Sequence, residues 1–241
     1  MTVNEGVTVT ALPNAKVWFD PGSRLEVYGT LTMHEGVWNR IWPNDGIVLK
    51  VFGSLNVLGT STVPIIFETR ASGNWTGIRF KNNSVGNINW ATIRDANRGV
   101  WVDLSDNITV DNCTIENFTE YGVYLNASSA TIQNCEINNG VGAASGIRAS
   151  GNVANPTIAD NTISNVPVGI VRVGNPGLAT ISGNDIFSCD DGIYMNYAGP
   201  DIYNNYLNFA HLFWIFDRLT CESVIKPLSL QDKITTSDST P

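Results

Sequence analysis

The stretch Val110-Asp-Asn-Cys-Thr-Ile-Glu-Asn-Phe-Thr-Glu-Tyr-Gly-Val-Tyr-Leu125 contains the two signals that decide the fold. The first signal is a pair of β-branched residues five positions apart, here Val110 and Ile115. The second is a glycine followed by alternating apolar residues, here Gly122-Val-Tyr-Leu125. Alternation of this kind is typical of short β-strands. The stretch therefore predicts strands joined by tight turns.

Both signals recur along the chain at a nearly constant spacing. The spacings of the glycine signal are 22, 23, 24, 23 and 23 residues, and the glycines are Gly77, Gly99, Gly122, Gly146, Gly169 and Gly192. The other signal ends in phase at Ile93, Ile115, Ile137, Ile163, Ile186 and Leu207. This period is too short for two helices and a turn, but it fits three short strands. The sequence predicts a solenoid whose strands pair in parallel with their equivalents one rung away, about 4.8 Å apart.

One position inside the paired apolar signal indicates a turn in every repeat. It is occupied by Ala91, Cys113, Cys135, Asn161, Asn184 and Asn205. Stacked asparagines can form hydrogen bonds along the solenoid axis and can satisfy the backbone amides of the turns. We expect the two cysteines of this column to be small buried thiols rather than a disulfide or a reactive pair.

The repeat as a whole, Ile-x-x-Asn-x-Ile followed by a variable turn and Gly-Ile-x-apolar, resembles the repeats of right-handed parallel β-helix proteins. That group includes pectate lyase-like and polygalacturonase-like enzymes and many surface proteins. The resemblance covers roughly residues 15–208. It implies an all-β, right-handed parallel β-helix with three strands per rung. It implies less about function, because the repeat is mostly core and turn chemistry.

The two ends of the chain follow the repeat less regularly. Leu25-Glu-Val-Tyr-Gly-Thr-Leu31 and Leu55-Asn-Val-Leu-Gly-Thr-Ser61 look like copies spaced by 30 residues, which predicts irregular N-terminal rungs and a loop near His34 to Asp45. We expect one β-helix domain over residues 1–227, with regular rungs at about 71–208 and a short helical cap at about 209–227. The polar residues 228–241 are expected to form a tail.

Composition and charge limit the partners of the chain. The formal net charge is −8, so most of the surface repels nucleic acid and anionic membranes. No run of 18 apolar residues is present, which excludes membrane insertion through a long apolar helix. The four cysteines lack the spacing of a zinc site. No signal peptide is visible at the N-terminus, which reads like the inside of a longer protein, so a removed signal would be hidden. The first rungs resemble those of secreted bacterial β-helix domains, which implies a secreted or cell-surface protein. The oligomeric state is not indicated.

Outward-facing residues of the glycine-led strands form the candidate binding face. In Gly-apolar-x-apolar the apolar positions point inward and x points outward. Aligned aromatic side chains can stack on sugar rings, and arginines can bind carboxylates through two hydrogen bonds. In the alternative interpretation the aromatics stack on one another and only stabilise the sheet. The expected glycan-binding residues are Arg79, Lys81, Trp101, Asp103, Tyr124, Arg148, Arg172 and Tyr194.

Arg172 does not fit strict alternation. Its position aligns with the inward residues Ala149 and Met195. A buried arginine without a partner is costly. We therefore expect a β-bulge that turns Arg172 outward. The alternative is a carboxylate partner inside the solenoid.

The adjacent carboxylates Asp190 and Asp191 resemble the Asp-Asp pair of polygalacturonases. That resemblance implies Asp190, Asp191 and His211 as catalytic residues, because glycoside hydrolysis needs an acid and a base on either side of the scissile bond. The chain departs from the family pattern in the preceding rung, where Pro167 and Val168 stand in place of a further Asp. The glycines that flank the family histidine are also missing around His211. In the alternative interpretation Asp190-Asp191-Gly192 is only a turn.

Two functions follow from these features. The first is a carbohydrate-active enzyme, a polysaccharide hydrolase or lyase that acts on an acidic glycan. A lyase would use Arg148 or Lys81 as its base and often a calcium ion held by several carboxylates, but no Asp cluster lies beside these residues in the sequence. The second is a non-catalytic glycan-binding or cell-surface structural module. No metal ligand set and no other cofactor is predicted.

Overall fold

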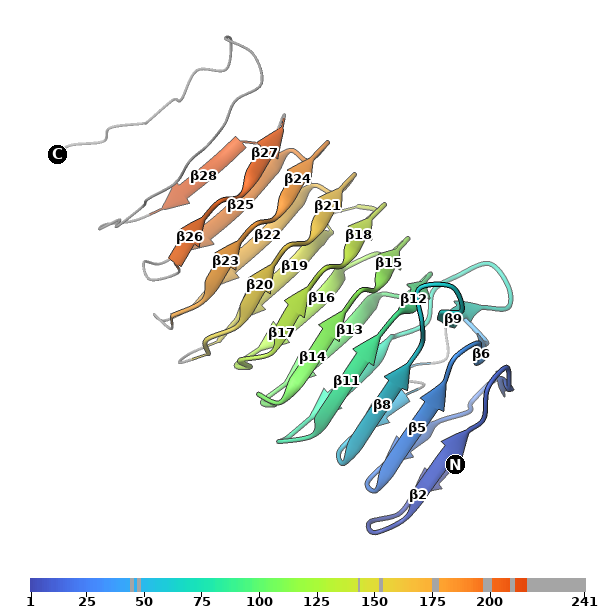
Figure 1. Ribbon diagram of the computed structural model, residues 1–241. Helices are drawn as coiled ribbons and strands as arrows, with labels where there is room; N and C mark the ends of the chain where they lie inside the picture. The colour runs from blue at the N-terminus through green and yellow to red at the C-terminus, as the bar shows by residue number, and fades with distance from the viewer. Residues whose placement is uncertain are drawn as a thin grey trace, which may run out of the picture.

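The computed structural model describes residues 1–43, 46, 49–142, 144–151, 154–174, 178–196 and 201–208, and the backbone of 211–215. It is an all-β, right-handed parallel β-helix with three parallel sheets along one axis (Figure 1). This confirms the predicted fold and the three strands per rung. The described part of the chain contains no helix long and apolar enough to cross a membrane.

Each sheet collects every third strand of the chain. Sheet A, the ten-stranded sheet, contains β1 (Thr2–Val3), β4 (Leu25–Val27), β7 (Leu49–Val51), β10 (Ile78–Lys81), β13 (Arg98–Asp103), β16 (Tyr121–Asn126), β19 (Ser145–Ser150), β22 (Val168–Val173), β25 (Asp191–Asn196) and β28 (His211–Ile215). Sheet B contains β2 (Thr8–Ala11), β5 (Thr30–His34), β8 (Ser54–Leu58), β11 (Val85–Asn89), β14 (Ile108–Asp111), β17 (Thr131–Gln133), β20 (Thr157–Ala159), β23 (Thr180–Ser182) and β26 (Asp201–Tyr203). Sheet C contains β3 (Lys16–Phe19), β6 (Trp38–Ile41), β9 (Ile65–Thr69), β12 (Ala91–Arg94), β15 (Thr114–Glu116), β18 (Glu136–Asn138), β21 (Thr162–Ser164), β24 (Asp185–Phe187) and β27 (Tyr206–Asn208).

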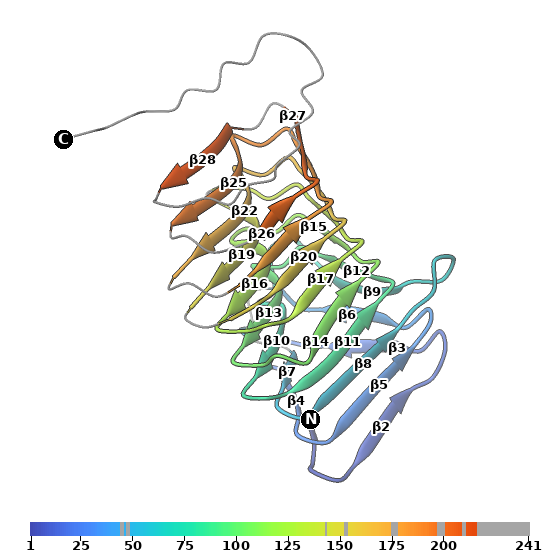
Figure 2. The same ribbon diagram turned by 60° about the vertical axis from the view of Figure 1, so that its left-hand side comes forward.

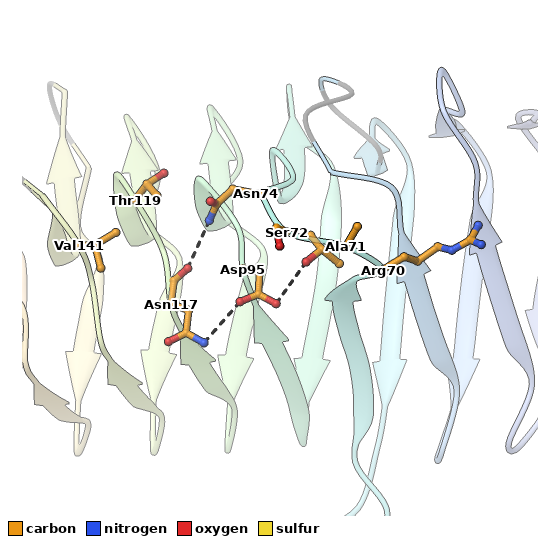
Figure 3. Close-up of a pocket in the computed structure, with 10 residues that line it drawn as sticks. Arg70, Ala71, Ser72, Asn74, Asp95, Asn117, Thr119 and Val141 are labelled. Atoms are coloured by element: carbon orange, nitrogen blue, oxygen red, sulfur yellow. Dashed lines mark hydrogen bonds between the residues drawn. The ribbon is translucent and has the colours of Figure 1, made fainter.

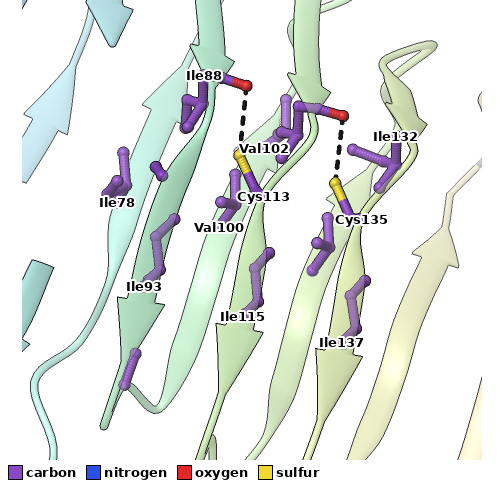
Figure 4. Packing of buried hydrophobic residues seen from close by; sticks show 14 of the residues in the cluster. Ile78, Ile88, Ile93, Val100, Val102, Cys113, Ile115, Ile132, Cys135 and Ile137 are labelled. Carbon is purple, nitrogen blue, oxygen red and sulfur yellow. Dashed lines mark hydrogen bonds between the residues drawn. The ribbon is translucent and has the colours of Figure 1, made fainter. Parts of the chain in front are cut away.

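The core is a set of columns in which equivalent side chains stack from rung to rung. Ile93, Ile115 and Ile137 follow one another in register, and all three are fully buried (Figure 4). Burying one such side chain contributes about 1.5–3 kcal/mol. The repeated β-branched positions in the sequence are therefore the positions that hold the solenoid together.

The cysteine column is part of this core. Cys113 and Cys135 are buried and free, and their Sγ atoms lie 3.5 and 3.6 Å from the carbonyl oxygens of Ile88 and Val110 (Figure 4). The hydrogen bond with Cys113, together with burial, raises the pKa of the Cys135 thiol well above its usual value. A thiol that stays protonated is a poor nucleophile. The prediction of small buried thiols is confirmed.

The asparagine column forms a hydrogen-bonded ladder at the next rungs. The Nδ2 of Asn184 donates to Oδ1 of Asn205 (2.8 Å) and to the carbonyl oxygen of Ile158 (3.0 Å). Its Oδ1 accepts from the backbone N–H of Asn161 at 3.0 Å. Each side chain therefore satisfies a turn amide of the rung before it, as the sequence predicts.

The N-terminal rungs are more regular than the sequence analysis predicts. Leu25 pairs with Leu49, and Leu31 pairs with Leu55. The true copies are thus Leu25-Glu-Val-Tyr-Gly-Thr-Leu31 and Leu49-Lys-Val-Phe-Gly-Ser-Leu55, so the spacing of 30 residues is wrong. The loop expected near His34 to Asp45 is also wrong over Trp38–Ile41, because these residues form strand β6.

The predicted helical cap is wrong where the structure describes it. His211–Ile215 form strand β28, which pairs in parallel with β25, so Leu212 takes the register position of Ile193. The exposed edge of β25 offers unpaired backbone groups, and another strand satisfies them better than a helix would. Residues 216–227 and the predicted tail at 228–241 lie outside the described residues.

Candidate functional site

The outer face of sheet A carries the residues that the sequence singles out. Strands β10, β13, β16 and β19 lie next to one another along the solenoid (Figure 2). Their register aligns Arg79, Trp101, Tyr124 and Arg148 in one column and Lys81, Asp103, Asn126 and Ser150 in the next. The outward positions of these strands therefore align in two columns, as alternation along the strands predicts.

Asp103 is the centre of a polar cluster on this face. It is only 4% exposed. Its Oδ2 accepts hydrogen bonds from Arg79 Nε at 2.9 Å and Lys81 Nζ at 3.2 Å. Its Oδ1 accepts from Trp101 Nε1 at 2.7 Å and Asn126 Nδ2 at 3.1 Å. Both carboxylate oxygens thus accept hydrogen bonds from protein donors.

The same contacts shift the titration of Asp103. Burial by itself raises the pKa of this carboxyl. Hydrogen bonds from Arg79, Asn126 and Trp101, with the positive charge of Arg79, outweigh burial and hold the pKa below its usual value. Hydrogen bonds to the ionised form account for the direction. Asp103 is therefore a charged structural anchor and not a proton donor.

The lowered pKa predicts how stability depends on pH. A group whose pKa is lower in the folded state stabilises the fold above its unfolded pKa, about 3.9 for Asp, and this contribution is lost as the pH falls through the folded value. Thermal unfolding of the wild type and Asp103→Asn should therefore differ most between pH 5 and 7, and the difference should shrink below about pH 3.9. A difference independent of pH would contradict this assignment.

Trp101 is enclosed by two arginines. The guanidinium carbon of Arg79 lies 3.4 Å from the ring centroid, and that of Arg98 lies 4.0 Å from it. Arg79 belongs to the preceding rung, and the guanidinium of Arg98 also lies 5.2 Å from the ring of Tyr124 in the following rung, so the two cations approach the Trp101 ring from opposite sides. Arg98 is held in turn by Glu120, with Nη2 2.6 Å from Oε2. The ring of Trp101 therefore stabilises the sheet, as the alternative interpretation proposes, and its faces are not open to a sugar.

The next two rungs carry a different arrangement. Tyr121 and Tyr124 stack with ring centroids 5.0 Å apart, and the guanidinium of Arg148 lies 5.7 Å from the ring of Tyr121. The hydroxyl of Tyr124 accepts a hydrogen bond from Ser150 Oγ at 3.0 Å. Arg148 is half-buried and has no carboxylate partner among the residues that the structure describes. It is a positioned cation with capacity for an external anion.

The aromatic and cationic character of this face continues toward the N-terminus. Tyr28 and Phe52 stack with centroids 4.7 Å apart and planes 5° from parallel. The Nζ of Lys50 lies 4.9 Å from the ring of Phe52. Lys50 precedes Arg79 in the register of sheet A. The face therefore extends over at least five successive rungs, from Lys50 to Arg148.

A family comparison agrees with this architecture. A family described as "Right handed beta helix region" matches residues 39–184 and 98–216. The chain belongs to the right-handed β-helix family. Among solved structures, an alginate lyase from Paenibacillus sp. str. FPU-7 is similar, with 16% identity, a TM-score of 0.38 and coverage of 83% of this chain and 86% of that chain. The search of curated proteins finds no match.

Two residues of the β-helix face escape the sequence prediction. Arg98 and Tyr121 stand directly before the glycines Gly99 and Gly122. In β13 and β16 the glycine and the next apolar residue are both buried, so alternation is interrupted and the residue before the glycine returns to the outer face. Extending each strand by one residue would have found Arg98 and Tyr121, which pair in register.

Arg172 of the β-helix lies inside, contrary to the predicted bulge. Strand β22 runs in continuous register, with Arg172 between Ala149 and Met195, and the residue is 4% exposed. It has no carboxylate partner among the described residues. Its guanidinium instead donates to the carbonyl oxygens of Val173 at 2.9 Å and Gly151 at 3.4 Å. The small side chain of Ala149 leaves room for this path, and burial lowers the pKa of Arg172.

The predicted catalytic residues lie farther along the β-helix. Asp191 begins β25 and pairs in register with His211 of β28, while Asp190 is exposed in the preceding turn. Tyr194 lies in the outer column, next to Val171. Asp191 is four rungs from Asp103, or ~19 Å along the axis. The catalytic role of Asp190, Asp191 and His211 stays a prediction.

Metal binding has no identified site in the described part of the β-helix. These residues contain no group of three or more His, Cys, Asp or Glu side chains that could hold an ion. The calcium ion of a lyase mechanism therefore has no ligand set to which we can assign it.

Proposed function

We propose that this protein binds an acidic polysaccharide along the outer face of sheet A. The observation that carries the proposal is Arg148, a half-buried guanidinium beside stacked tyrosines that has no carboxylate partner among the described residues. Arginine binds a carboxylate through two parallel hydrogen bonds, which suits the uronic acids of acidic glycans.

The charge balance of this face agrees with the proposal. From Lys50 to Arg148, its cations Lys50, Arg79, Lys81, Arg98 and Arg148 outnumber its carboxylates Asp103 and Glu120. The chain as a whole has a formal net charge of −8, so this positive charge is concentrated on one face of an otherwise acidic protein. A positive strip on an acidic protein attracts an anionic ligand to one face and repels it from the others.

The repeat of the solenoid also suits a polymer. Equivalent positions recur about every 4.8 Å along sheet A, so successive sugars of a polymer would lie over successive rungs. The Tyr121 and Tyr124 rings offer apolar area, and Arg148 offers the charge. A polysaccharide ligand is also consistent with the secreted or cell-surface location that we propose.

Substitution of Arg148 tests the binding proposal. Wild-type protein should bind polygalacturonate or alginate in affinity gel electrophoresis, with retardation that weakens as salt increases. Arg148→Gln should lower the affinity about tenfold or more, because a charged hydrogen-bond pair contributes about 1.5–3 kcal/mol.

The matched control is Lys16→Gln, which removes an exposed cation from strand β3 of sheet C, outside this face. It should leave binding unchanged. Equal affinity of Arg148→Gln and wild type for every polyanion would reject the proposal.

Cleavage of the bound glycan is a second candidate function. The observation that favours it is the register pairing of Asp191 with His211 at one end of the same sheet. We propose that a hydrolase would use Asp190, Asp191 and His211, and that a lyase would use Lys81 or Arg148 as the base. New reducing ends without unsaturated sugars, lost in Asp191→Asn with binding intact, would support hydrolysis, and new reducing ends accompanied by unsaturated sugars would support a lyase. Binding without either product would identify a non-catalytic glycan-binding module.

A further inference from the structure

A second aromatic surface lies at the N-terminal end of the solenoid. Trp18 is 55% exposed and Trp42 is 39% exposed. The guanidinium of Arg70 lies 4.6 Å from the ring of Trp18 and 5.6 Å from that of Trp42. Arg70 Nη1 also donates to Asp20 Oδ1 at 2.7 Å. We call Trp18, Asp20, Trp42 and Arg70 the tryptophan corner.

The backbone holds this corner in place. Trp42 and Arg70 directly follow β6 and β9, and their N–H groups donate to the carbonyl oxygens of Phe19 at 2.9 Å and Ile41 at 2.8 Å. The parallel ladder of sheet C therefore continues one residue beyond the strands. The side chains are thus stacked by the solenoid repeat, and Arg70 fixes the two indoles in one arrangement before any ligand arrives.

Exposure of two adjacent indoles is unusual. Single exposed apolar side chains are common, but clustered large ones mark binding surfaces. Tryptophan has the largest ring for stacking, and the axial and equatorial C–H groups of a sugar are apolar enough to pack on it. A rigid pair of exposed indoles beside polar groups is suited to a sugar ring.

A polar groove begins at Arg70 and runs away from the tryptophan corner. Its volume is about 600 Å³, and it is lined by Ser72, Asn74, Asp95, Asn117 and Thr119 among others, ending at Val141 (Figure 3). It follows the corner where the chain passes from sheet C to sheet A. The path from Arg70 to Val141 covers three rung steps, or ~14 Å. The groove shares no lining residue with the outer face of sheet A.

The chemistry of the groove disfavours an anionic ligand. Arg70 is its only cation among the described lining residues, and its guanidinium extends toward the N-terminal rungs and Asp20 (Figure 3). Asp95 places a carboxylate in the middle, which accepts long hydrogen bonds from Thr69 Oγ1 (3.3 Å) and Asn117 Nδ2 (3.4 Å). Amide, hydroxyl and carboxylate groups bind the hydroxyls of a sugar, and the carboxylate repels a uronate.

We propose that the tryptophan corner and this groove form a second glycan site, which takes a neutral, hydroxyl-rich polysaccharide segment. One sugar ring stacks on the exposed indole surface of Trp18 and Trp42. The following sugars lie in the groove, where Asp95 and Asn74 accept or donate hydrogen bonds to their hydroxyls. This site does not depend on the acidic-glycan face, so the protein would hold two polymers of different charge.

Affinity gel electrophoresis of the full chain with soluble neutral polymers tests the second site. The probes are hydroxyethylcellulose, glucomannan and xyloglucan, with polygalacturonate as the charged comparison. At least one neutral polymer should retard the wild type. Trp18→Ala with Trp42→Ala should weaken that binding about tenfold or more, as expected for tryptophans at the centre of a binding site, and should leave polygalacturonate binding unchanged.

Two further variants separate binding from folding. Tyr203→Ala removes a ring that is 42% exposed on sheet B, and it should change the binding of neither the neutral polymer nor polygalacturonate. Asp95→Asn removes the groove carboxylate without removing an indole, and it should weaken neutral-polymer binding several-fold. Asn tolerates the positive φ of 58° at this position. Circular dichroism should show the same fold for all variants.

The proposal is overturned if no neutral polymer retards the wild type, or if the double tryptophan variant is retarded as strongly as the wild type. It is also overturned if that variant loses only polygalacturonate binding, because the corner would then belong to an acidic-glycan surface. Failure of the acidic-glycan proposal is seen separately, with polygalacturonate and Arg148→Gln.

Discussion

Asn184→Ala is expected to lower the free energy of unfolding by about 4 kcal/mol. The side chain is fully buried, and it donates to Asn205 Oδ1 and to the carbonyl oxygen of Ile158. It also accepts from the backbone N–H of Asn161. Alanine would remove the acceptor of the Asn161 N–H and the amide donor to the carbonyl oxygen of Ile158, whereas Asn205 Oδ1 would keep the backbone N–H of residue 184. Each unsatisfied buried group costs about 1–3 kcal/mol.

Urea denaturation followed by circular dichroism measures this effect. The midpoint should be compared with that of Asn87→Ala, which truncates an exposed asparagine in β11 and should change stability by less than about 0.5 kcal/mol. Midpoints are the better measure, because a solenoid can unfold in parts rather than in one step. Equal midpoints for the two variants would show that the ladder does not stabilise the solenoid.

Asp103→Ala should have the second-largest effect, a loss of about 3 kcal/mol of stability. Removing one partner of a buried ion pair costs about 3–5 kcal/mol of stability, and partial exposure of the cations reduces this value. The side chains of Arg79 and Lys81 are 18% and 23% exposed, while that of Asp103 is 6% exposed. Trp101 would lose its hydrogen-bond acceptor in the same change.

The same variant separates structure from binding. Because Arg79 and Lys81 lose their carboxylate partner, the folded Asp103→Ala protein should bind polygalacturonate at least as tightly as the wild type. Asp103→Asn keeps the shape of the side chain and one acceptor oxygen, so its stability should fall between those of the wild type and Asp103→Ala. If Asp103→Ala stays folded but loses polygalacturonate binding, Asp103 contacts the ligand and is not only a structural anchor.

The binding face could be predicted from the sequence only in part. Arg79, Trp101, Tyr124 and Arg148 are found by alternation, because register repeats from rung to rung. Alternation cannot show which rings are open, since that depends on Arg98 and on side-chain direction. Trp101 was expected to be available to sugars, yet two guanidinium groups cover it.

Arg172 shows how an energetic argument can mislead when partners are unknown. Alternation alone places it inside, which is where the structure has it. The sequence favours a bulge because a buried arginine without a carboxylate partner is costly. The acceptors are instead backbone carbonyl oxygens, that of Val173 in the same strand and that of Gly151, which belongs to the previous rung. Only folding brings that rung within hydrogen-bond distance.

The sequence by itself determined the solenoid, its three strands per rung, the core columns and the asparagine ladder. These features repeat at a constant period, so each position is specified by its neighbours one rung away. The tertiary structure alone decided the continuation of the solenoid at β28, the cage around Asp103 and the tryptophan corner. The corner joins residues as far apart in the chain as Asp20 and Arg70. Contacts of this kind depend on side chains that do not repeat, so the period of the sequence does not predict them.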